Sequence, residues 1–173
     1  AHWLYDMPYE RIEVVVHPQS VIHSMVEFVD DSIKMQASLP SMHLPIQYAL
    51  SYPDRLDRSG TTLDHPLRWP DVARLDFEAV DMDRFPCLRL AFEAGRRGGV
   101  APAVLLGADE QAVALFLQGK IHLTDIAAIA ERTLARAGDE GRLDNAGDAP
   151  DVDQVLAACA WAQEQALQLA NVE

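Results

Sequence analysis

The sequence predicts an α+β protein that consists of a hairpin-containing sheet segment, an extended linker and a C-terminal four-helix bundle. Three observations support this fold class. Runs of β-branched residues lie before residue 40, four prolines interrupt residues 53–86, and helix-like stretches that stop at glycines follow Pro86. We therefore expect boundaries that give residues 1–52, 53–85 and 86–173.

The first part contains three predicted strands and a short helix. The strands are expected over Arg11–His17, Val21–Val29 and Ile33–Leu39, and Asp30-Asp31-Ser32 is a turn signal between the last two. Two strands joined by a tight turn predict a β-hairpin. Pro45 is then expected to open a helix over Ile46–Ser51, because proline is tolerated at the first helical position.

The second part is predicted to be mostly extended, and the third part is predicted to be mostly helical. Residues 53–85 read as an extended linker with a short strand near Arg74–Phe77, and residues 138–150 read as a loop. The four expected helices are Pro86–Arg97, Pro102–Gln118, a helix capped by Thr124 that runs to Ala137, and a helix capped by Asp151 that runs to about Ala170.

Composition excludes several classes of function. The 173 residues are 49% hydrophobic and carry a net charge of −13, so we expect no binding to nucleic acid or to an anionic membrane surface. No apolar run reaches the ~20 residues that span a bilayer, and no signal peptide is apparent at the start. Cys87 and Cys159 are far apart, which favours buried thiols in a reducing cytoplasm over a disulfide.

Two polar clusters are the candidates for chemistry. The first is His17-Pro-Gln-Ser20-Val-Ile-His23-Ser, where a strand breaks at a proline. Its histidines can serve as acid, base or ligand, or can simply cap a strand end. A metal site within this stretch is weakly supported, because the two histidines lack helical spacing and a flanking carboxylate pair. In the second cluster, Pro40 and Pro45 stiffen a loop that carries Met42, which is either a core filler or a ligand contact.

Taken together, these segments resemble the 1-deoxy-D-xylulose 5-phosphate reductoisomerase family over almost the whole chain. The residues that carry the resemblance are His17-Pro-Gln-Ser-Val-Ile-His-Ser-Met25, Leu39-Pro40-x-Met42-x-Leu44-Pro45-Ile46-Gln-Tyr-Ala-Leu50, Asp81-x-Asp83-Arg84-Phe85-Pro86-Cys87-Leu88-x-Leu90-Ala91 and Phe116-Leu117-x-Gly119-Lys120-Ile121-x-Leu123-x-Asp125-Ile126.

The resemblance implies an enzyme that rearranges 1-deoxy-D-xylulose 5-phosphate and reduces the product with NADPH to 2-C-methyl-D-erythritol 4-phosphate. This is a step of non-mevalonate isoprenoid synthesis in the bacterial cytoplasm, is inhibited by fosmidomycin, and is performed by a homodimer with Mg²⁺ or Mn²⁺. The first residues, 1–52, would then belong to its catalytic and dimerisation domain. Ser20 and His23 match positions that face the substrate, and Pro40 and Met42 match positions on the nicotinamide side.

The resemblance also implies that the NADPH-binding domain, the metal carboxylates and the phosphate-binding residues precede Ala1. We therefore expect no metal ligand in these 173 residues and no activity from them alone. The family's Asp-Met-Arg is Ser41-Met42-His43 here, which removes a charged pair from the loop. Two further departures, Asp30-Asp31-Ser32 and Leu106-Gly-Ala-Asp-Glu110, look structural. The alternatives are a non-catalytic dimerisation module and a metallohydrolase that uses His17 and His23.

Overall fold

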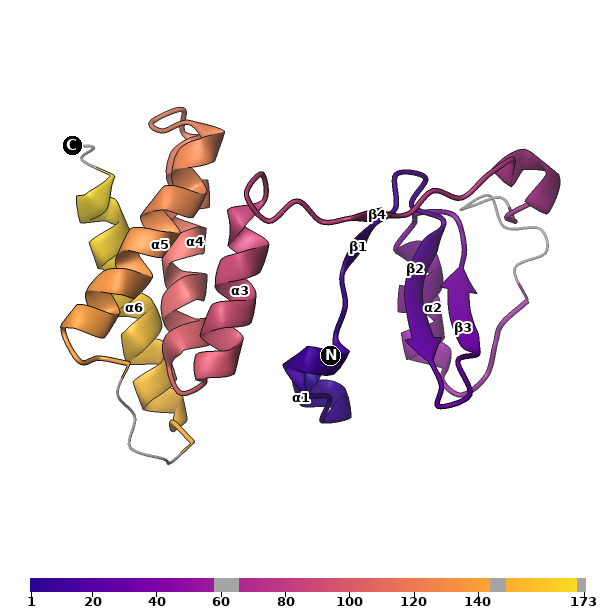
Figure 1. Ribbon diagram of the computed structural model, residues 1–173, viewed down its shortest axis with the longest axis horizontal. Coiled ribbons are helices and arrows are strands. Elements are labelled where there is room, and N and C mark those ends of the chain that lie inside the picture. Colours follow the sequence, from indigo (N-terminus) through magenta and orange to yellow (C-terminus); the bar gives the residue numbers. More distant parts are fainter. Residues whose placement is uncertain (58–65, 144–148, 171–173) are drawn as a thin grey trace. The chain divides into compact units, whose positions relative to one another are not determined.

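The computed structural model describes residues 1–57, 66–143 and 149–170, and they form two compact units (Figure 1). One unit is Val14–Val80. The other combines Ala1–Glu13 with Asp81–Glu173. The chain therefore passes between the units twice, once at each end of the inserted segment 14–80. These divisions differ from the predicted boundaries after residues 52 and 85, which stay a prediction.

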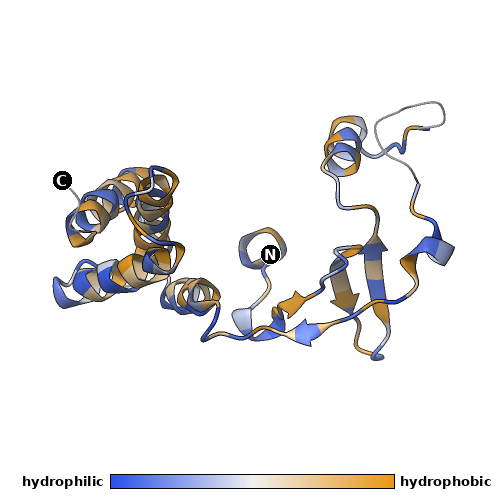
Figure 2. Cartoon of the chain, turned by 90° about the horizontal axis from the view of Figure 1, so that it is seen from above, coloured by the Kyte–Doolittle hydropathy of each residue, from blue (hydrophilic) through white to orange (hydrophobic). Residues whose placement is uncertain are grey.

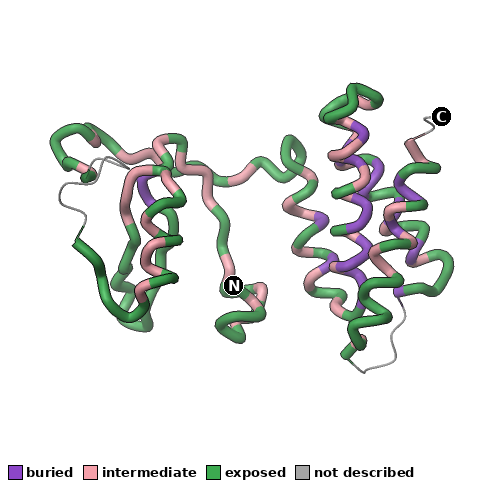
Figure 3. The backbone as a smooth tube through the Cα atoms, turned by 180° about the vertical axis from the view of Figure 1, so that it is seen from behind, coloured by how far each residue is buried: buried purple, intermediate pink, exposed green. Residues whose placement is uncertain are grey.

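Four packed helices form the larger part of the second unit, as the sequence predicts. They are α3 (Pro86–Arg97), α4 (Ala101–Leu117), α5 (Leu123–Asp139) and α6 (Val152–Leu169). The central helix α4 contacts each of the other three. Buried residues concentrate here (Figure 3), and most are small or aliphatic, including Leu90, Val104, Ala108, Ala130 and Ala162. Alanine-rich faces let the helix axes approach closely, so these four helices hold most of the apolar core.

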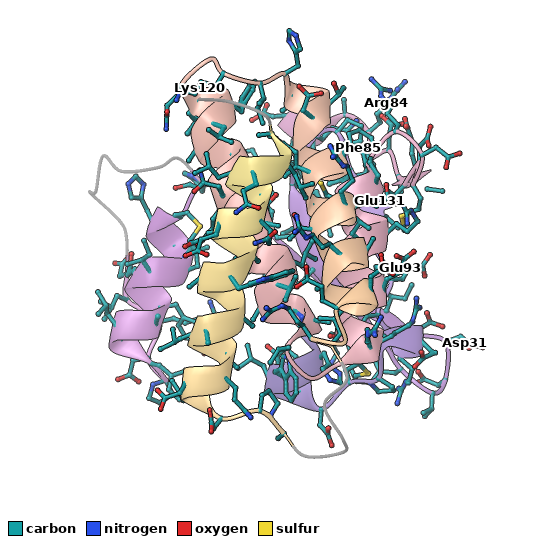
Figure 4. The ribbon with its side chains drawn as sticks, turned by 90° about the vertical axis from the view of Figure 1, so that its left-hand side faces the viewer. Asp31, Arg84, Phe85, Glu93, Lys120 and Glu131 are labelled. Atoms are coloured by element: carbon teal, nitrogen blue, oxygen red, sulfur yellow. The ribbon has the colours of Figure 1, made fainter. Side chains whose placement is uncertain are left out.

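Ion pairs on the surface of this unit join neighbouring helices. The Arg89 guanidinium contacts Glu93 at 3.0 Å within α3 and Glu131 of α5 at 2.8 Å; Figure 4 labels both glutamates. These hydrogen bonds raise the pKa of Arg89. Because all three groups are well exposed, the pairs contribute little to stability compared with the apolar core.

The ends of the helices test the predicted caps. Asp151 caps α6 as expected, since its carboxylate accepts from the Gln154 N–H at 2.7 Å while the Gln154 amide accepts from the Asp151 N–H. The predicted cap of α5 is wrong. The helix begins at Leu123 with His122 as N-cap, because the Asp125 carboxylate accepts from the His122 N–H at 2.7 Å. Thr124 is already helical.

The Val14–Val80 unit contains the predicted hairpin. Strand β2 (Ile22–Glu27) pairs antiparallel with β3 (Ile33–Ala37), with an irregularity between Ile22 and Ser24. The predicted first strand is too long, because residues Tyr9–Arg11 form the 3-10 turn η1 and only β1 (Val15–Val16) is extended and paired. Its partner is β4 (Glu78–Ala79), which lies just beyond the expected strand at 74–77.

Helix α2 (His43–Ser51) begins two residues before the predicted proline start. The Ser41 hydroxyl accepts from the His43 N–H at 3.2 Å and opens the first turn. Pro45 is then the third helical residue. A backbone N–H at this position would have no intrahelical acceptor, so the helix loses no hydrogen bond to the proline. A second 3-10 turn, η2 (Trp69–Val72), lies within the predicted linker.

Apolar burial in this unit is slight. Among the described residues, only Val21 and Ile22 of the unit are buried hydrophobics, whereas large apolar side chains of the hairpin stay exposed; these are Met25, Val26, Phe28, Val29, Ile33 and Met35. In Figure 2 orange apolar residues alternate with blue polar ones along the hairpin strands. None of the helices described in either unit is long and apolar enough to cross a membrane.

Candidate functional site

A pocket of about 590 Å³ lies in the Val14–Val80 unit at the end of the hairpin. Its walls come from β2, β3, the loop that follows β3, and helix α2. The lining residues are His23, Gln36, Ser38, Pro40, Ser41, Met42, Leu44, Pro45, Tyr48 and Arg55. The structure therefore brings together three of the four predicted site residues, His23, Pro40 and Met42.

Hydrogen bonds hold the His23 ring in place. Nε2 lies 2.9 Å from the backbone carbonyl of Ser20, and Nδ1 lies 3.2 Å from the Gln36 amide oxygen and 3.3 Å from the Ser38 hydroxyl. A carbonyl oxygen only accepts, so Nε2 carries the proton in the neutral ring. Nδ1 then keeps its lone pair, which can accept from the Ser38 hydroxyl, whereas the Gln36 amide oxygen beside it is itself an acceptor.

Ser20 contributes through its backbone. Its side chain is not among the residues that line the pocket, which differs from the expectation that it faces a ligand there. Its φ of +50° is in the left-handed region, which few non-glycine residues adopt. This turn directs the Ser20 carbonyl toward His23, and the residue therefore orients the histidine ring.

The loop between β3 and α2 forms the opposite wall. Pro40 and Pro45 restrict its backbone, and Met42 lies between them with 68% of its surface exposed. Such exposure excludes the core-filling role for this methionine within the described residues. The neighbouring Ser41 and His43 hydrogen bond to each other, with the hydroxyl 3.1 Å from the His43 Nδ1. They therefore form a local turn where the resemblance has a charged pair.

Tyr48 and Arg55 are among the lining residues that were not predicted as site residues from the sequence. The Arg55 guanidinium stacks on the Tyr48 ring with its Cζ 4.3 Å from the ring centroid. Tyr48 comes from α2 and Arg55 follows the turn after that helix, so only the fold brings them to the pocket. The one sequence signal is the pair of prolines at 45 and 53, which makes this segment double back. None of the residues lining the pocket carries a carboxylate, so Arg55 brings a cationic side chain to its wall.

His17 has different partners from His23. Its Nδ1 lies 2.7 Å from the carbonyl of Asp76, its ring stacks on Phe77 at 4.6 Å, and Gln19 hydrogen bonds the Asp76 side chain. Its Nε2 is buried with no partner among the described residues. No group of three His, Cys, Asp or Glu side chains that could hold a metal ion occurs in the described part of the chain. The geometry therefore gives the metallohydrolase alternative no support.

Comparison with protein families gives a match over residues 37–165 to the family described as DXP reductoisomerase C-terminal domain. Two curated relatives are 1-deoxy-D-xylulose 5-phosphate reductoisomerases. That of Acetivibrio thermocellus is 48% identical over 95% of this chain and 40% of the relative, and that of Pelodictyon phaeoclathratiforme is 50% identical over 96% and 41%. The chain thus spans about two fifths of the length of the curated relatives that it matches.

Solved structures show the same similarity. The Zymomonas mobilis 1-deoxy-D-xylulose 5-phosphate reductoisomerase in complex with NADPH is 40% identical, with a TM-score of 0.84 over 100% of this chain and 43% of that chain. A DOX-P reductoisomerase in complex with NADPH, fosmidomycin and magnesium is 38% identical, with a TM-score of 0.89 over 98% and 41%.

Proposed function

Because this chain belongs to the DXP reductoisomerase family, we propose that it is the C-terminal part of an enzyme that converts 1-deoxy-D-xylulose 5-phosphate to 2-C-methyl-D-erythritol 4-phosphate with NADPH. The observation that carries this proposal is the pocket in which His23 faces the Pro40–Met42 loop. Nothing in the comparisons favours the alternative of a module that only dimerises, since the relatives named above are reductoisomerases.

In this proposal His23 positions the substrate. Its Nε2–H is engaged by the Ser20 carbonyl, which leaves Nδ1 to accept a hydrogen bond from a substrate hydroxyl. The Ser38 hydroxyl next to Nδ1 is the partner that a substrate hydroxyl would replace. A fixed ring of this kind holds the reacting carbons in line without transferring a proton itself, and such positioning lowers the barrier mainly by removing unproductive orientations.

Pro40 and Met42 are proposed to form the nicotinamide side. NADPH supplies the hydride when it is bound. The exposed Met42 thioether is polarisable and packs well on an aromatic ring, and Pro40 limits the motion of the loop that presents it. The described residues do not provide the ligand set for Mg²⁺ or Mn²⁺, so no step through a cation is assigned to this chain.

We propose further that the whole protein is a homodimer in the bacterial cytoplasm, with residues 1–52 belonging to its catalytic and dimerisation domain, 53–85 to a linker and 86–173 to its helical domain. The exposed apolar side chains of β2 and β3 support association, because they leave apolar surface uncovered on both faces of the hairpin. The outer edges of the two-stranded hairpin could add strand pairing.

The test is His23→Gln in the full-length protein. Glutamine keeps a polar side chain but cannot keep the ring geometry, so we expect kcat/KM for 1-deoxy-D-xylulose 5-phosphate to fall by roughly ten- to a thousandfold. Metal affinity should change little. Steady-state kinetics with metal titration and a thermal melt measure these effects. His122→Gln, at the exposed start of α5, is the matched control and should keep normal kcat/KM.

A role limited to capping the strand end predicts the reverse pattern. In that case His23→Gln would lower the melting temperature while kcat/KM stayed at the wild-type value, and the assignment of His23 to the substrate would be withdrawn.

A further inference from the structure

Both connections between the two units lie next to helix α3: the 1–13 segment contacts it, and the segment from Asp81 leads into it. The return connection enters it directly, because the Asp81 carboxylate accepts from the N–H groups of Asp83 at 3.0 Å and Arg84 at 2.9 Å and forms the turn before Pro86. The outgoing connection is the Ala1–Glu13 segment, which packs beside α3 through its 3-10 turn Tyr9–Arg11.

The Tyr9 ring packs directly against Gly95 of this helix. A Cβ placed on Gly95 would lie 2.3 Å from the Tyr9 hydroxyl oxygen and 2.4 Å from its Cζ. Real Cβ atoms do not approach other atoms so closely, so any residue with a side chain at position 95 displaces the tyrosine ring. One turn earlier in α3, Phe92 meets the same ring edge-on at a centroid distance of 6.1 Å.

The surrounding contacts orient the tyrosine but are weaker. His2 stacks on Tyr9 at 4.5 Å, and the His2 Nδ1 lies 2.8 Å from the Met7 carbonyl. Glu10 pairs with Arg96 at 3.5 Å, with both side chains more than half exposed. An exposed pair at that distance contributes little, so shape complementarity between Tyr9 and Gly95 must supply most of the attachment.

We propose that Tyr9 and Gly95 form a clasp that attaches the 1–13 segment to α3 and so fixes the outgoing connection at the same helix in which the return connection starts. Strands β1 and β4, which lie next to the two connections, pair with each other at Val15–Ala79 and Val16–Glu78. With the clasp closed, both connections are held at both ends. With the clasp open, the contacts described for the outgoing connection are the β1–β4 pairing and the exposed Glu10–Arg96 pair.

The experiment is limited trypsin digestion of the 173-residue chain, with cleavage after Arg11 followed by mass spectrometry. Arg11 lies in the turn that Tyr9 begins, where its N–H bonds the Pro8 carbonyl at 2.9 Å. We expect Gly95→Ala to speed this cleavage by roughly tenfold, as a forced overlap in a packed contact would. Gly138→Ala is the control, because its Cβ meets only the Arg97 Nη1 at an ordinary 3.7 Å, and it should leave the rate unchanged.

Tyr9→Ala should speed the same cleavage without altering α3. In the double variant Tyr9→Ala, Gly95→Ala the rate should equal that of Tyr9→Ala alone, because the alanine has no ring left to displace. An unchanged rate in Gly95→Ala, or a second full increase in the double variant, would overturn the clasp. Circular dichroism checks that the total helix content is kept in each variant, as expected from the higher helix propensity of alanine.

Discussion

Ser32 donates two hydrogen bonds to Asp30 in the turn between β2 and β3, from its hydroxyl at 2.6 Å and from its backbone N–H at 3.1 Å. Both bonds favour the ionised carboxylate and lower the pKa of Asp30. A group whose pKa is lower in the folded state contributes stability above its unfolded pKa and loses that contribution as the pH falls through the folded pKa. The turn is therefore supported at neutral pH and weakened in acid.

Ser32→Ala should raise the pKa of Asp30 toward its ordinary value, because it removes the hydroxyl donor that contributes most to the shift. Titration of the Asp30 side chain by NMR measures the change. Ser24→Ala, on β2 away from the turn, is the control and should leave the Asp30 titration as in the wild type. A titration curve that is identical in Ser32→Ala would show that the backbone N–H alone sets the pKa.

At the scale of elements, the contact between α4 and α6 depends on Gly107. A Cβ on this glycine would lie 2.3 Å from the backbone carbonyl oxygen of Cys159. The obstacle is backbone, which cannot rotate aside as the end of a side chain can. Gly107 thus sets the distance between the two helices that contact each other most extensively in the bundle.

We expect Gly107→Ala to lower the free energy of unfolding by about 1–3 kcal/mol, the range for overpacking a core, despite a gain of up to about 1 kcal/mol in helix propensity. Urea unfolding followed by circular dichroism measures it. The same change at Gly138 in α5 should be neutral or slightly stabilising, because there is room for the methyl group. Equal stability of the two variants would show that the helices adjust without cost.

The elements could be predicted from sequence to different degrees, for physical reasons. Helix boundaries were readable where a local signal marks them, as with Pro86 at the start of α3 and Asp151 before α6. The start of α5 was not readable, since either Thr124 or His122 can serve as its N-cap. The hydrogen bond from the His122 N–H to the Asp125 carboxylate decides between them. Strand length was overestimated at Arg11–His17, because β-branched composition records a preference for extension and not the presence of a pairing partner.

The site was predictable in part for the same reason. Local motifs carry His23, Pro40 and Met42, and all three line the pocket, while their roles stay a prediction. Tyr48 and Arg55 depend on the packing of α2 against the chain that follows it, and no residue pattern indicated the left-handed backbone of Ser20. Long-range contacts such as Tyr9 with Gly95 have no local signal at all.

At the scale of the whole molecule, we predict that the 173-residue chain alone does not oxidise NADPH in the presence of 1-deoxy-D-xylulose 5-phosphate and Mg²⁺. The described residues gather no group of side chains that could hold a metal ion, so they do not supply the cation that polarises the substrate oxygens for hydride transfer. Loss of absorbance at the NADPH band is the measurement, with a full-length relative as the positive control. NADPH oxidation by this chain above the rate without protein would contradict the proposal that the metal ligands of the site lie outside these 173 residues.

The insertion of residues 14–80 within the helical unit has a consequence for the order of folding during synthesis. The 1–13 segment is made before the inserted unit, and its partner α3 follows only after the whole inserted unit has been made. Tyr9 therefore lacks its α3 partner until then. Bringing the two together closes the loop formed by the chain between them, and the entropic penalty of closure grows with loop length. Pairing of β1 with β4 shortens that loop before α3 is complete. The β1–β4 pair thus brings the 1–13 segment and α3 near each other before they make contact.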